Sequence, residues 1–358
     1  MRPSLRGIYS VPHKAPHISA GMNLLNFCTG QRPKATDVTP WHGVYAPLAF
    51  FCFFLFSFSF ALPATLGKWT SATPMPARKT EVAAAQLQGK IYVIGGFDYF
   101  FFGGVSSSVH AYDPETNLWE EKASLPEALH HTAAAAVNGK LYVIGGFRRL
   151  WPWKAVSSVW EYDPGANVWS AKSSMPTARG ALALGVIGEK IYAVGGKSGS
   201  EILGSLEVYD PGKDAWSSLP SMPTPRDHLA VGVVSERVYA IGGRKGTMSQ
   251  NLATNEVFEP ADKRWSTRAP MPTARSGIAS AVLGSHIYVF GGEEPERTFD
   301  ANEAYDTDTD RWIKLAPMPT ARHGLGAARW KEQIYVISGG PRPGASRSDL
   351  NEVFAPLR

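Results

Sequence analysis

Residues 175–196, in the middle of the chain, read MPTARGALALGVIGEKIYAVGG. A stretch of small residues ends in a tight turn near Gly188, and a short apolar run then ends in two glycines. Ile191 and Tyr192 open that run, and β-branched and aromatic residues of this kind are typical of strands. This segment therefore predicts two short β-strands joined by a turn.

The same pattern recurs six times along the chain. Paired glycines return after 50, 50, 47, 49 and 48 residues, and a set of tryptophans returns after 50, 50, 47, 49 and 47. Two independent markers that share one period identify a true repeat. The glycine pairs begin at Gly95, Gly145, Gly195, Gly242, Gly291 and Gly339, and the tryptophans are Trp69, Trp119, Trp169, Trp216, Trp265 and Trp312.

Each repeat predicts four strands. After the paired glycines come a variable loop and a third strand that ends in Tyr-Asp-Pro, as in residues 112–114. A turn then leads into a fourth strand, which carries the tryptophan. Four strands in meander order are typical of a propeller blade, so we expect an all-β, six-bladed β-propeller.

The two ends of the repeat array predict how the ring closes. Trp69 comes before the first glycine pair, whereas the last repeat ends at Asn351–Phe354 with no tryptophan after it. We therefore expect the strand around Trp69 to complete the sixth blade. Such closure would leave no free sheet edge.

The glycine pairs, the Tyr-Asp-Pro and tryptophan spacing, and the Met-Pro-Thr-Ala-Arg segments at residues 175–179, 271–275 and 318–322 resemble the kelch repeat. The resemblance covers residues 67–358 and implies a β-propeller. It says little about activity, because the family combines binding scaffolds with a few enzymes.

Most of the net charge of +5 lies before the repeats. Residues 1–66 contain five basic side chains and one acidic side chain, so the repeats themselves are nearly neutral. A protein that binds duplex nucleic acid needs a basic surface. The sequence therefore predicts no nucleic-acid partner.

The segment before the repeats predicts export. Residues 1–43 form a basic leader, which we expect to be disordered, and Val44–Leu62 contains no charged residue. That run fits either the core of a cleaved signal peptide or a single transmembrane helix, with translation starting at Met1 or Met22. The basic flank would stay in the cytoplasm and place the propeller outside, secreted or anchored in the membrane through Val44–Leu62.

One face of the predicted ring collects basic residues. In a meander blade, the connection from one blade to the next and the loop between the second and third strands open on the same face. In kelch modules that capture acidic peptides, arginines of the first connection line the ligand site, so the resemblance implies a binding role here. A residue repeated in most units can instead brace the blades. The candidates are Arg78, Arg179, Arg226, Arg275, Arg322 and, in the divergent second repeat, His130.

Two loops on the same face are long and aromatic: FDYFFFGG at residues 97–104 and FRRLWPWK at residues 147–154. Exposed aromatic clusters mark interaction surfaces, although such loops can also pack on each other. An acidic loop, Glu293–Asp300, lies across the ring from them. The candidate ligand-binding residues are Tyr99, Phe101, Arg148, Arg149, Trp151 and Trp153.

Known catalytic patterns are not matched. The copper site of galactose oxidase needs a cysteine, and both cysteines of this chain precede the repeats. The iron motif of nitrile-specifier proteins fails because Ala304 stands where a histidine is required. We therefore predict no catalytic residue, no metal and no cofactor.

Taken together, these observations predict an exported, non-enzymatic binding module or scaffold for a protein or glycan ligand. Two alternatives remain open. One is an enzyme that acts on an anionic sugar, as a sialic-acid mutarotase does, and the other is purely structural display at the cell surface.

Overall fold

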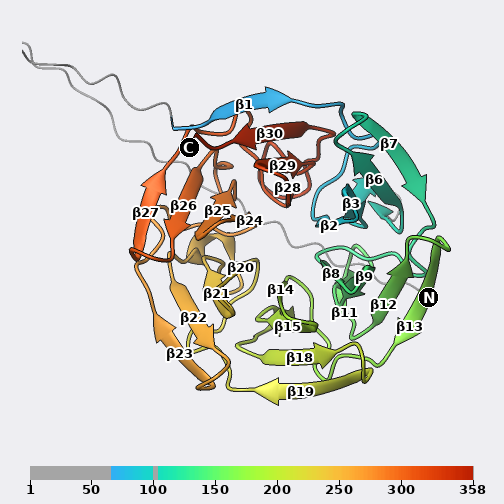
Figure 1. The fold of residues 1–358 in the computed structure, drawn as a ribbon, viewed down its shortest axis with the longest axis horizontal. Helices are drawn as coiled ribbons and strands as arrows, with labels where there is room; N and C mark the ends of the chain where they lie inside the picture. Colours follow the sequence, from blue (N-terminus) through green and yellow to red (C-terminus); the bar gives the residue numbers. More distant parts are fainter. Residues whose placement is uncertain (1–65, 100–103, 358) are drawn as a thin grey trace, which may run out of the picture. The chain divides into compact units, whose positions relative to one another are not determined.

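The computed structural model describes residues 66–99 and 104–357, which fold into six four-stranded antiparallel sheets around one axis (Figure 1). The predicted all-β, six-bladed propeller is confirmed. A single 3-10 turn, Met248–Gln250, is the helical element among these residues. Within the described part of the chain, no helix has the length and apolar character needed to cross a membrane. The predicted leader and Val44–Leu62 lie outside the described residues.

Each blade runs outward from the axis, with its first strand innermost and its fourth strand on the rim (Figure 1). Blade 6 takes its fourth strand from the beginning of the repeat array. The strands of blades 1 to 3 are β2 (Ala83–Leu87), β3 (Lys90–Ile94), β6 (Val109–Asp113) and β7 (Leu118–Lys122); β8 (Ala133–Val137), β9 (Lys140–Ile144), β12 (Val159–Asp163) and β13 (Val168–Lys172); and β14 (Ala183–Ile187), β15 (Lys190–Val194), β18 (Leu206–Asp210) and β19 (Ala215–Leu219). Those of blades 4 to 6 are β20 (Ala230–Val234), β21 (Arg237–Ile241), β22 (Asn255–Glu259) and β23 (Arg264–Thr267); β24 (Ala279–Leu283), β25 (His286–Phe290), β26 (Asn302–Asp306) and β27 (Arg311–Lys314); and β28 (Gly326–Trp330), β29 (Gln333–Ile337), β30 (Asn351–Ala355) and β1 (Lys68–Ser71).

The ring closes as the ends of the array predict. β1 pairs antiparallel with β30, and Trp69 lies opposite Phe354. The indole N–H of Trp69 donates to the carbonyl of Ala316 at 2.9 Å, in the connection that follows blade 5. The other five repeat tryptophans donate in the same way to the carbonyls of Thr73, Ala123, Ser173, Pro220 and Ala269.

The core lies between neighbouring blades. One apolar cluster, for example, combines Tyr142 and Ile144 of blade 2 with Ile191 and Tyr209 of blade 3. The ring of Tyr209 also contacts that of Trp216, at a centroid distance of 5.1 Å. Because each cluster draws on two blades, a blade buries its apolar faces only when its neighbours are present.

The paired glycines are required by close packing at the inner end of each blade. A Cβ added at Gly95 would lie 2.4 Å from the carbonyl oxygen of Leu129. In blade 6 the structure corrects the register by one residue, because Ser338 occupies the position of the first glycine. Gly339 is therefore the second glycine of that blade, and the last interval becomes 47, equal to the last tryptophan interval.

Three short hairpins extend the loop face beyond the blades. They follow the glycine pairs of blades 1 to 3 and contain β4 (Phe97–Tyr99) and β5 (Gly104–Val105), β10 (Phe147–Arg148) and β11 (Lys154–Ala155), and β16 (Lys197–Ser198) and β17 (Glu201–Ile202). In all six blades, a backbone bridge joins the residue after the glycine pair to the segment that enters the blade. The two kinds of connection therefore share one face, as predicted.

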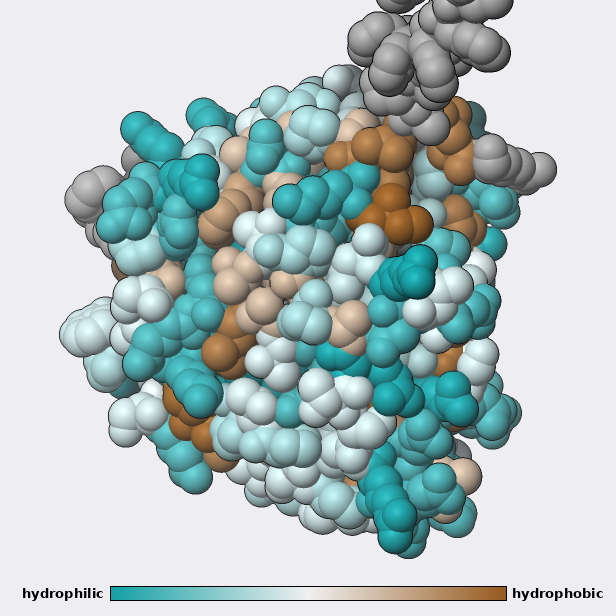
Figure 2. All heavy atoms as spheres, turned by 90° about the vertical axis from the view of Figure 1, so that its left-hand side faces the viewer, coloured by the Kyte–Doolittle hydropathy of each residue, from teal (hydrophilic) through white to brown (hydrophobic). Residues whose placement is uncertain are grey.

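The rim of the propeller is largely polar. Figure 2 shows the side where blade 5 lies, with hydrophilic residues over most of the surface and hydrophobic ones in a few patches. A groove of about 590 Å³ on blades 5 and 6 is lined by Leu66, Leu283 and Ile313, among others. The site described next lies instead at the axis, on the loop face.

Candidate functional site

A ring of six residues, one from each blade, surrounds the axis on the loop face. The backbone N–H of each member donates to the carbonyl of the member from the preceding blade, at 2.7 to 3.2 Å, so the hydrogen bonds form a closed circle. This mouth ring consists of Glu81, His131, Ala181, His228, Gly277 and Gly324.

All members of the mouth ring have left-handed backbone conformations. The φ angles are 55° at Glu81, 51° at His131 and 53° at His228. Glycine adopts this conformation freely, whereas a residue with a Cβ loses about 1 kcal/mol or more there. The chain thus places ionisable side chains where glycine would be less strained, a feature that clusters at functional sites.

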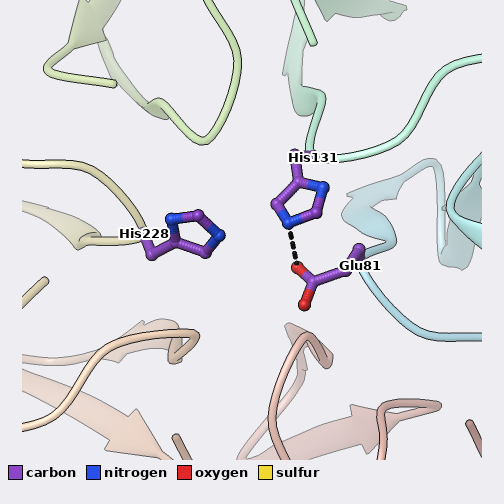
Figure 3. A group of neighbouring side chains, drawn as sticks. All are labelled: Glu81, His131 and His228. Atoms are coloured by element: carbon purple, nitrogen blue, oxygen red, sulfur yellow. Dashed lines mark ion pairs between the residues drawn. The ribbon is translucent and has the colours of Figure 1, made fainter. Parts of the chain in front are cut away.

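Glu81, His131 and His228 point toward one another from blades 1, 2 and 4 (Figure 3). Their potential ligand atoms all lie within 4.8 Å of one another. His131 Nε2 is 3.1 Å from Glu81 Oε2, and the rings of His131 and His228 meet edge to face at 4.8 Å. Both imidazoles are buried, and the Glu81 side chain is only 10% exposed.

Burial favours the uncharged forms of Glu81, His131 and His130. It raises the pKa of the Glu81 carboxyl, holds the pKa of His131 well below its ordinary value and lowers that of His130 to about 4. His131 Nδ1 lies 2.5 Å from His130 Nδ1, and His130 Nε2 lies 3.1 Å from the carbonyl of Arg149. Glu81, His131, His130 and the carbonyl of Arg149 are thus connected in one continuous chain of polar contacts.

The other side chains of this site surround the guanidinium of Arg244. Arg244, the residue after the glycine pair of blade 4, places Nη2 2.9 Å from His228 Nε2 and Nη1 3.0 Å from Glu293 Oε1. His228 Nδ1 lies 2.8 Å from Asp227 Oδ1. His228 therefore donates at Nδ1 and accepts at Nε2.

The carboxylates of Asp227 and Glu293, both next to Arg244, are held in their charged form. Burial opposes their ionisation, but His228 and Arg244 outweigh it at Asp227, and His323 and Arg244 outweigh it at Glu293. The pKa of each is therefore lowered.

His323, from blade 6, lies between Glu81 and Glu293. Its Nε2 lies 3.5 Å from Glu81 Oε1, 3.4 Å from Glu293 Oε2 and 2.7 Å from the carbonyl of Gly344. Its Nδ1 lies 3.1 Å from the carbonyl of Gly340. Both nitrogens of this ring therefore face backbone carbonyl oxygens. We call the whole set the polar cluster: Glu81, His131, Asp227, His228, Arg244, Glu293 and His323.

A cavity of about 510 Å³ opens above the polar cluster. Glu81, His131, Arg244 and Glu293 lie at its base, and its walls are apolar: Phe97, Leu150, Trp151, Trp153 and Met248. Trp153 stacks against His131 with a ring distance of 4.6 Å, whereas the side chain of Trp151 is 85% exposed. Aromatic walls and a few convergent polar groups are typical of ligand sites.

The structure places four of the predicted arginines inside the blades and away from this cavity. Arg179, Arg226, Arg275 and Arg322 are fully buried, and their guanidinium groups pair with Glu207, Glu256, Glu303 and Glu352. Each also donates to a carbonyl of the second strand of its own blade. Burial lowers the pKa of Arg322 to about 10, which still leaves it charged at neutral pH. In this structure these four side chains brace the blades, which is the alternative stated for a residue repeated in most units.

The first two blades depart from this arrangement. Arg78 is exposed, with Nη2 3.3 Å from the carbonyl of Arg347, and the neighbouring Lys79 takes the buried position. Lys79 Nζ donates to the carbonyl of Gly95 at 3.0 Å, and burial lowers its pKa to about 8. In blade 2 the position belongs to Leu129, which is completely buried.

The predicted residues of the aromatic loops lie in different surroundings. Trp151 and Trp153 line the cavity, and His130 lies buried beneath it. Arg148 pairs with Glu127, and Arg149 contributes its carbonyl to His130. Tyr99 belongs to β4, and Phe101 lies outside the described residues.

The sequence interpretation missed most of the polar cluster. Its members come from five blades and occupy only three repeat positions: the two residues after the repeated arginine and the residue after the glycine pair. A comparison of the repeats at the first two of these positions would have singled out His131, Asp227, His228 and His323, because several other repeats have glycine, alanine or serine there.

Comparison with known proteins identifies the repeat. A family model described as the KLHDC2/KLHL20/DRC7 Kelch-repeats domain matches residues 55–243, and a Kelch motif model matches residues 225–272 and 274–319. Kelch-like protein 26 of Danio rerio is 35% identical over 69 residues, which are 19% of this chain and 11% of that protein. Kelch-like protein 22 of Homo sapiens is 42% identical over 57 residues, 16% of this chain and 9% of that protein. The matched segments thus span about a tenth of the length of these relatives.

A solved structure described as "Structure of YjhT" has a similar fold. Its TM-score is 0.71 at 15% sequence identity, and the match covers 81% of this chain and 98% of that one. At this identity the likeness concerns the fold alone.

Proposed function

The chain belongs to the kelch-repeat β-propeller family, and on this premise we propose that it is a non-enzymatic binding module that recognises a protein or glycan ligand in the cavity on its loop face. Kelch propellers generally serve in protein interaction. The proposal places the contact at the axis, where blades 1 and 2 depart from the repeat.

The cavity beside Trp151 is the observation that carries the proposal. Among the described large apolar side chains, Trp151 is the most exposed, at 85%. Tryptophans beside a concave site are frequent binding hot spots, since they bury a large apolar area on contact. The volume of about 510 Å³ suits one or two amino-acid side chains or a sugar unit.

The base of the cavity adds selectivity. Arg244 and Glu293 are already paired with each other, so a ligand that reaches them must offer polar groups of its own. A purely apolar ligand would leave these groups without water and without a new partner, which costs free energy.

The test compares the ligand profile of the wild type with that of Trp151→Ala, on a glycan array and on a peptide library. Because Trp151 is exposed, we expect unfolding free energy to change by less than about 0.5 kcal/mol, while ligand affinity falls about tenfold or more. Leu118→Ala is the matched control, since Leu118 is also exposed but lies in the rim strand β7. Equal affinity of the wild type and Trp151→Ala for the ligand would contradict the proposal.

A second candidate is an enzyme acting on an anionic sugar. The cationic side chain of Arg244 lines the cavity, which suits a carboxylate-bearing ring. An assay of anomer interconversion of sialic acid with the purified protein tests this candidate. A rate no higher than that in buffer would exclude this reaction, and failure of both ligand screens as well would favour structural display.

Export of the propeller is a separate proposal. It is supported by the net positive charge of the segment 1–43 and by the absence of charged residues in Val44–Leu62. N-terminal sequencing of the mature protein tests it: a new terminus after Leu62 indicates secretion, and an intact Val44–Leu62 in a membrane fraction indicates anchoring. A soluble, uncleaved chain in the cytoplasm would refute export.

A further inference from the structure

We propose that the base of the cavity is a binding site for a divalent transition-metal ion of the zinc class, with His131, His228 and Glu81 as its ligands. The inference goes beyond the proposed function, because it depends on the polar cluster and not on the identity of the protein or glycan ligand.

The donor set selects the class of metal. Two imidazoles and one carboxylate are typical ligands of zinc and related first-row ions, whereas calcium and magnesium prefer oxygen ligands alone. The donor atoms of the three side chains already lie within 4.8 Å of one another. Two ligands bound to one ion at about 2.0 to 2.2 Å lie about 3 to 4 Å apart, so only small side-chain shifts are needed.

Both histidines are oriented as metal ligands are. His131 Nδ1 is held by His130 at 2.5 Å, and His228 Nδ1 is held by Asp227 at 2.8 Å. In each ring the Nδ1 contact leaves the lone pair of Nε2 facing the group. Hydrogen bonds from the second nitrogen of a ligating histidine fix its tautomer and its orientation in metal sites.

The backbone beneath the three ligands is rigidly placed. Each ligand belongs to the mouth ring, whose six hydrogen bonds close around the axis. The left-handed φ angles at Glu81, His131 and His228 direct the three side chains to one point (Figure 3). Gly277 and Gly324 serve the same backbone role, so the ring itself does not require an ionisable side chain at Glu81, His131 or His228.

A positive charge already lies on one of the three ligands. The guanidinium of Arg244 places Nη2 2.9 Å from His228 Nε2. A divalent cation bound to His228 would displace this guanidinium. Arg244 also lines the cavity, so its side chain has about 510 Å³ of free space to enter when the metal displaces it.

The neighbouring groups explain why these three ligands are chosen. Both ring nitrogens of His323 lie against backbone carbonyl oxygens, those of Gly340 at 3.1 Å and Gly344 at 2.7 Å. Glu293 accepts from the backbone N–H of Gly344 at 3.1 Å and from Arg244. Three protein ligands leave one position of a tetrahedral ion free, as in catalytic and ligand-binding zinc sites.

The experiment titrates the chelator-treated, full-length protein with zinc sulfate in a calorimeter, and with cobalt chloride in a spectrophotometer. We expect one zinc ion per chain and the visible bands of a four- or five-coordinate cobalt ion. His131→Ala and His228→Ala should each weaken zinc binding by about 100-fold or more, and Glu81→Gln by about tenfold. His286→Ala is the matched control, because His286 lies at the start of β25 outside the polar cluster, and its affinity should equal that of the wild type.

Arg244→Gln gives the opposite and more specific result. It removes the competing cation and retains all three ligands, so zinc should bind about tenfold more tightly. Lys197→Gln, which removes a cation next to Trp153 without touching the ligands, should leave the affinity unchanged. This pair keeps the proposal testable even where a histidine variant fails to fold.

Two results would overturn the proposal: no stoichiometric zinc binding by either the wild type or Arg244→Gln, or unchanged binding in folded His131→Ala and His228→Ala. Trp151→Ala separates this proposal from the proposed function, since it should lose the protein or glycan ligand and keep zinc.

Discussion

In blades 3 to 6 a buried arginine pairs with a glutamate of the third strand, whereas in blade 2 Leu129 and Trp160 occupy the same two positions. Both arrangements fill the inner end of a blade: Leu129 belongs to an apolar cluster against which Trp160 packs. Buried ion pairs and well-packed apolar pairs of similar volume are often close in stability. A repeated arginine is therefore a packing solution here.

The departure in blade 2 also supports the cavity. Glu127 stands where blades 3 to 6 have a threonine, and it accepts from the indole of Trp160 at 2.8 Å. The same carboxylate pairs with Arg148, in the loop that carries Trp151 and Trp153. The comparison teaches that the regular blades maintain the ring, while the divergent blades build the ligand-facing surface.

The largest effect is expected from breaking the regular arrangement. Arg275→Ala leaves Glu303 charged and without its partner inside blade 5, so we expect a loss of about 3–5 kcal/mol in the free energy of unfolding. Urea denaturation followed by tryptophan fluorescence measures it. Arg78→Ala, at an exposed arginine, should change stability by less than about 0.5 kcal/mol. A small effect of Arg275→Ala would show that the pair does not brace the blade.

A somewhat smaller effect is expected from moving the regular arrangement into blade 2. Leu129→Arg buries a guanidinium that has no glutamate at position 160, which should cost about 3 kcal/mol. Adding Trp160→Glu supplies the partner and should recover most of the loss in the same denaturation assay. If the double variant were no more stable than Leu129→Arg, the two arrangements would not be interchangeable.

The phenol of the third-strand tyrosine offers a finer comparison. Tyr112 and Tyr162 donate to Asn117 and Asn167 at 2.6 Å, whereas Tyr209 donates to the carboxylate of Asp214 at the same distance. Hydrogen bonds to charged acceptors are stronger, so Asp214→Asn should cost about 1 kcal/mol of unfolding free energy. If a charged acceptor does strengthen this hydrogen bond, the converse change, Asn167→Asp, should not lower the free energy of unfolding.

Alkaline pH should gradually weaken the packing around Tyr112 and Tyr162 in blades 1 and 2. Burial raises the pKa of Tyr112 and of Tyr162 to about 12, while tyrosines in an unfolded chain ionise near pH 10. The folded state holds these phenols neutral, so their contribution is complete below pH 10 and is lost as the pH rises from about 10 to 12. Urea midpoints at pH 8, 10 and 11 measure the decline, and Tyr112→Phe should reduce its slope. Midpoints that stay constant over this range would contradict the prediction.

The fold was predictable because its signals are local. A tryptophan and a glycine pair every 47 to 50 residues define the blades, and the unpaired Trp69 at one end predicts the closing strand. The one-residue shift of the glycine pair in blade 6 was not predicted, because Gly339 and Gly340 happen to form a glycine pair next to Ser338. Only the backbone bridge of His323 to Gly340 reveals the register.

The candidate site was predictable in part. Trp151 and Trp153 interrupt the repeat within one short loop, so composition alone draws attention to them. Glu81, His131 and His228 lie 50 and 97 residues apart, and no linear motif joins them. They meet because ring closure brings equivalent positions of different blades to one axis.

Sequence alone was sufficient for the number of blades, the order of their strands and the strand that closes the ring, since each depends on short-range hydrophobic and turn patterns. Tertiary structure was needed to distinguish the roles of the charged residues. Arg275 and Arg244 look alike in the sequence, yet one is enclosed within a blade by Glu303 and the other lies at the base of a cavity. Burial and the nearest opposite charge separate a brace from a site residue, and both arise only where six blades converge.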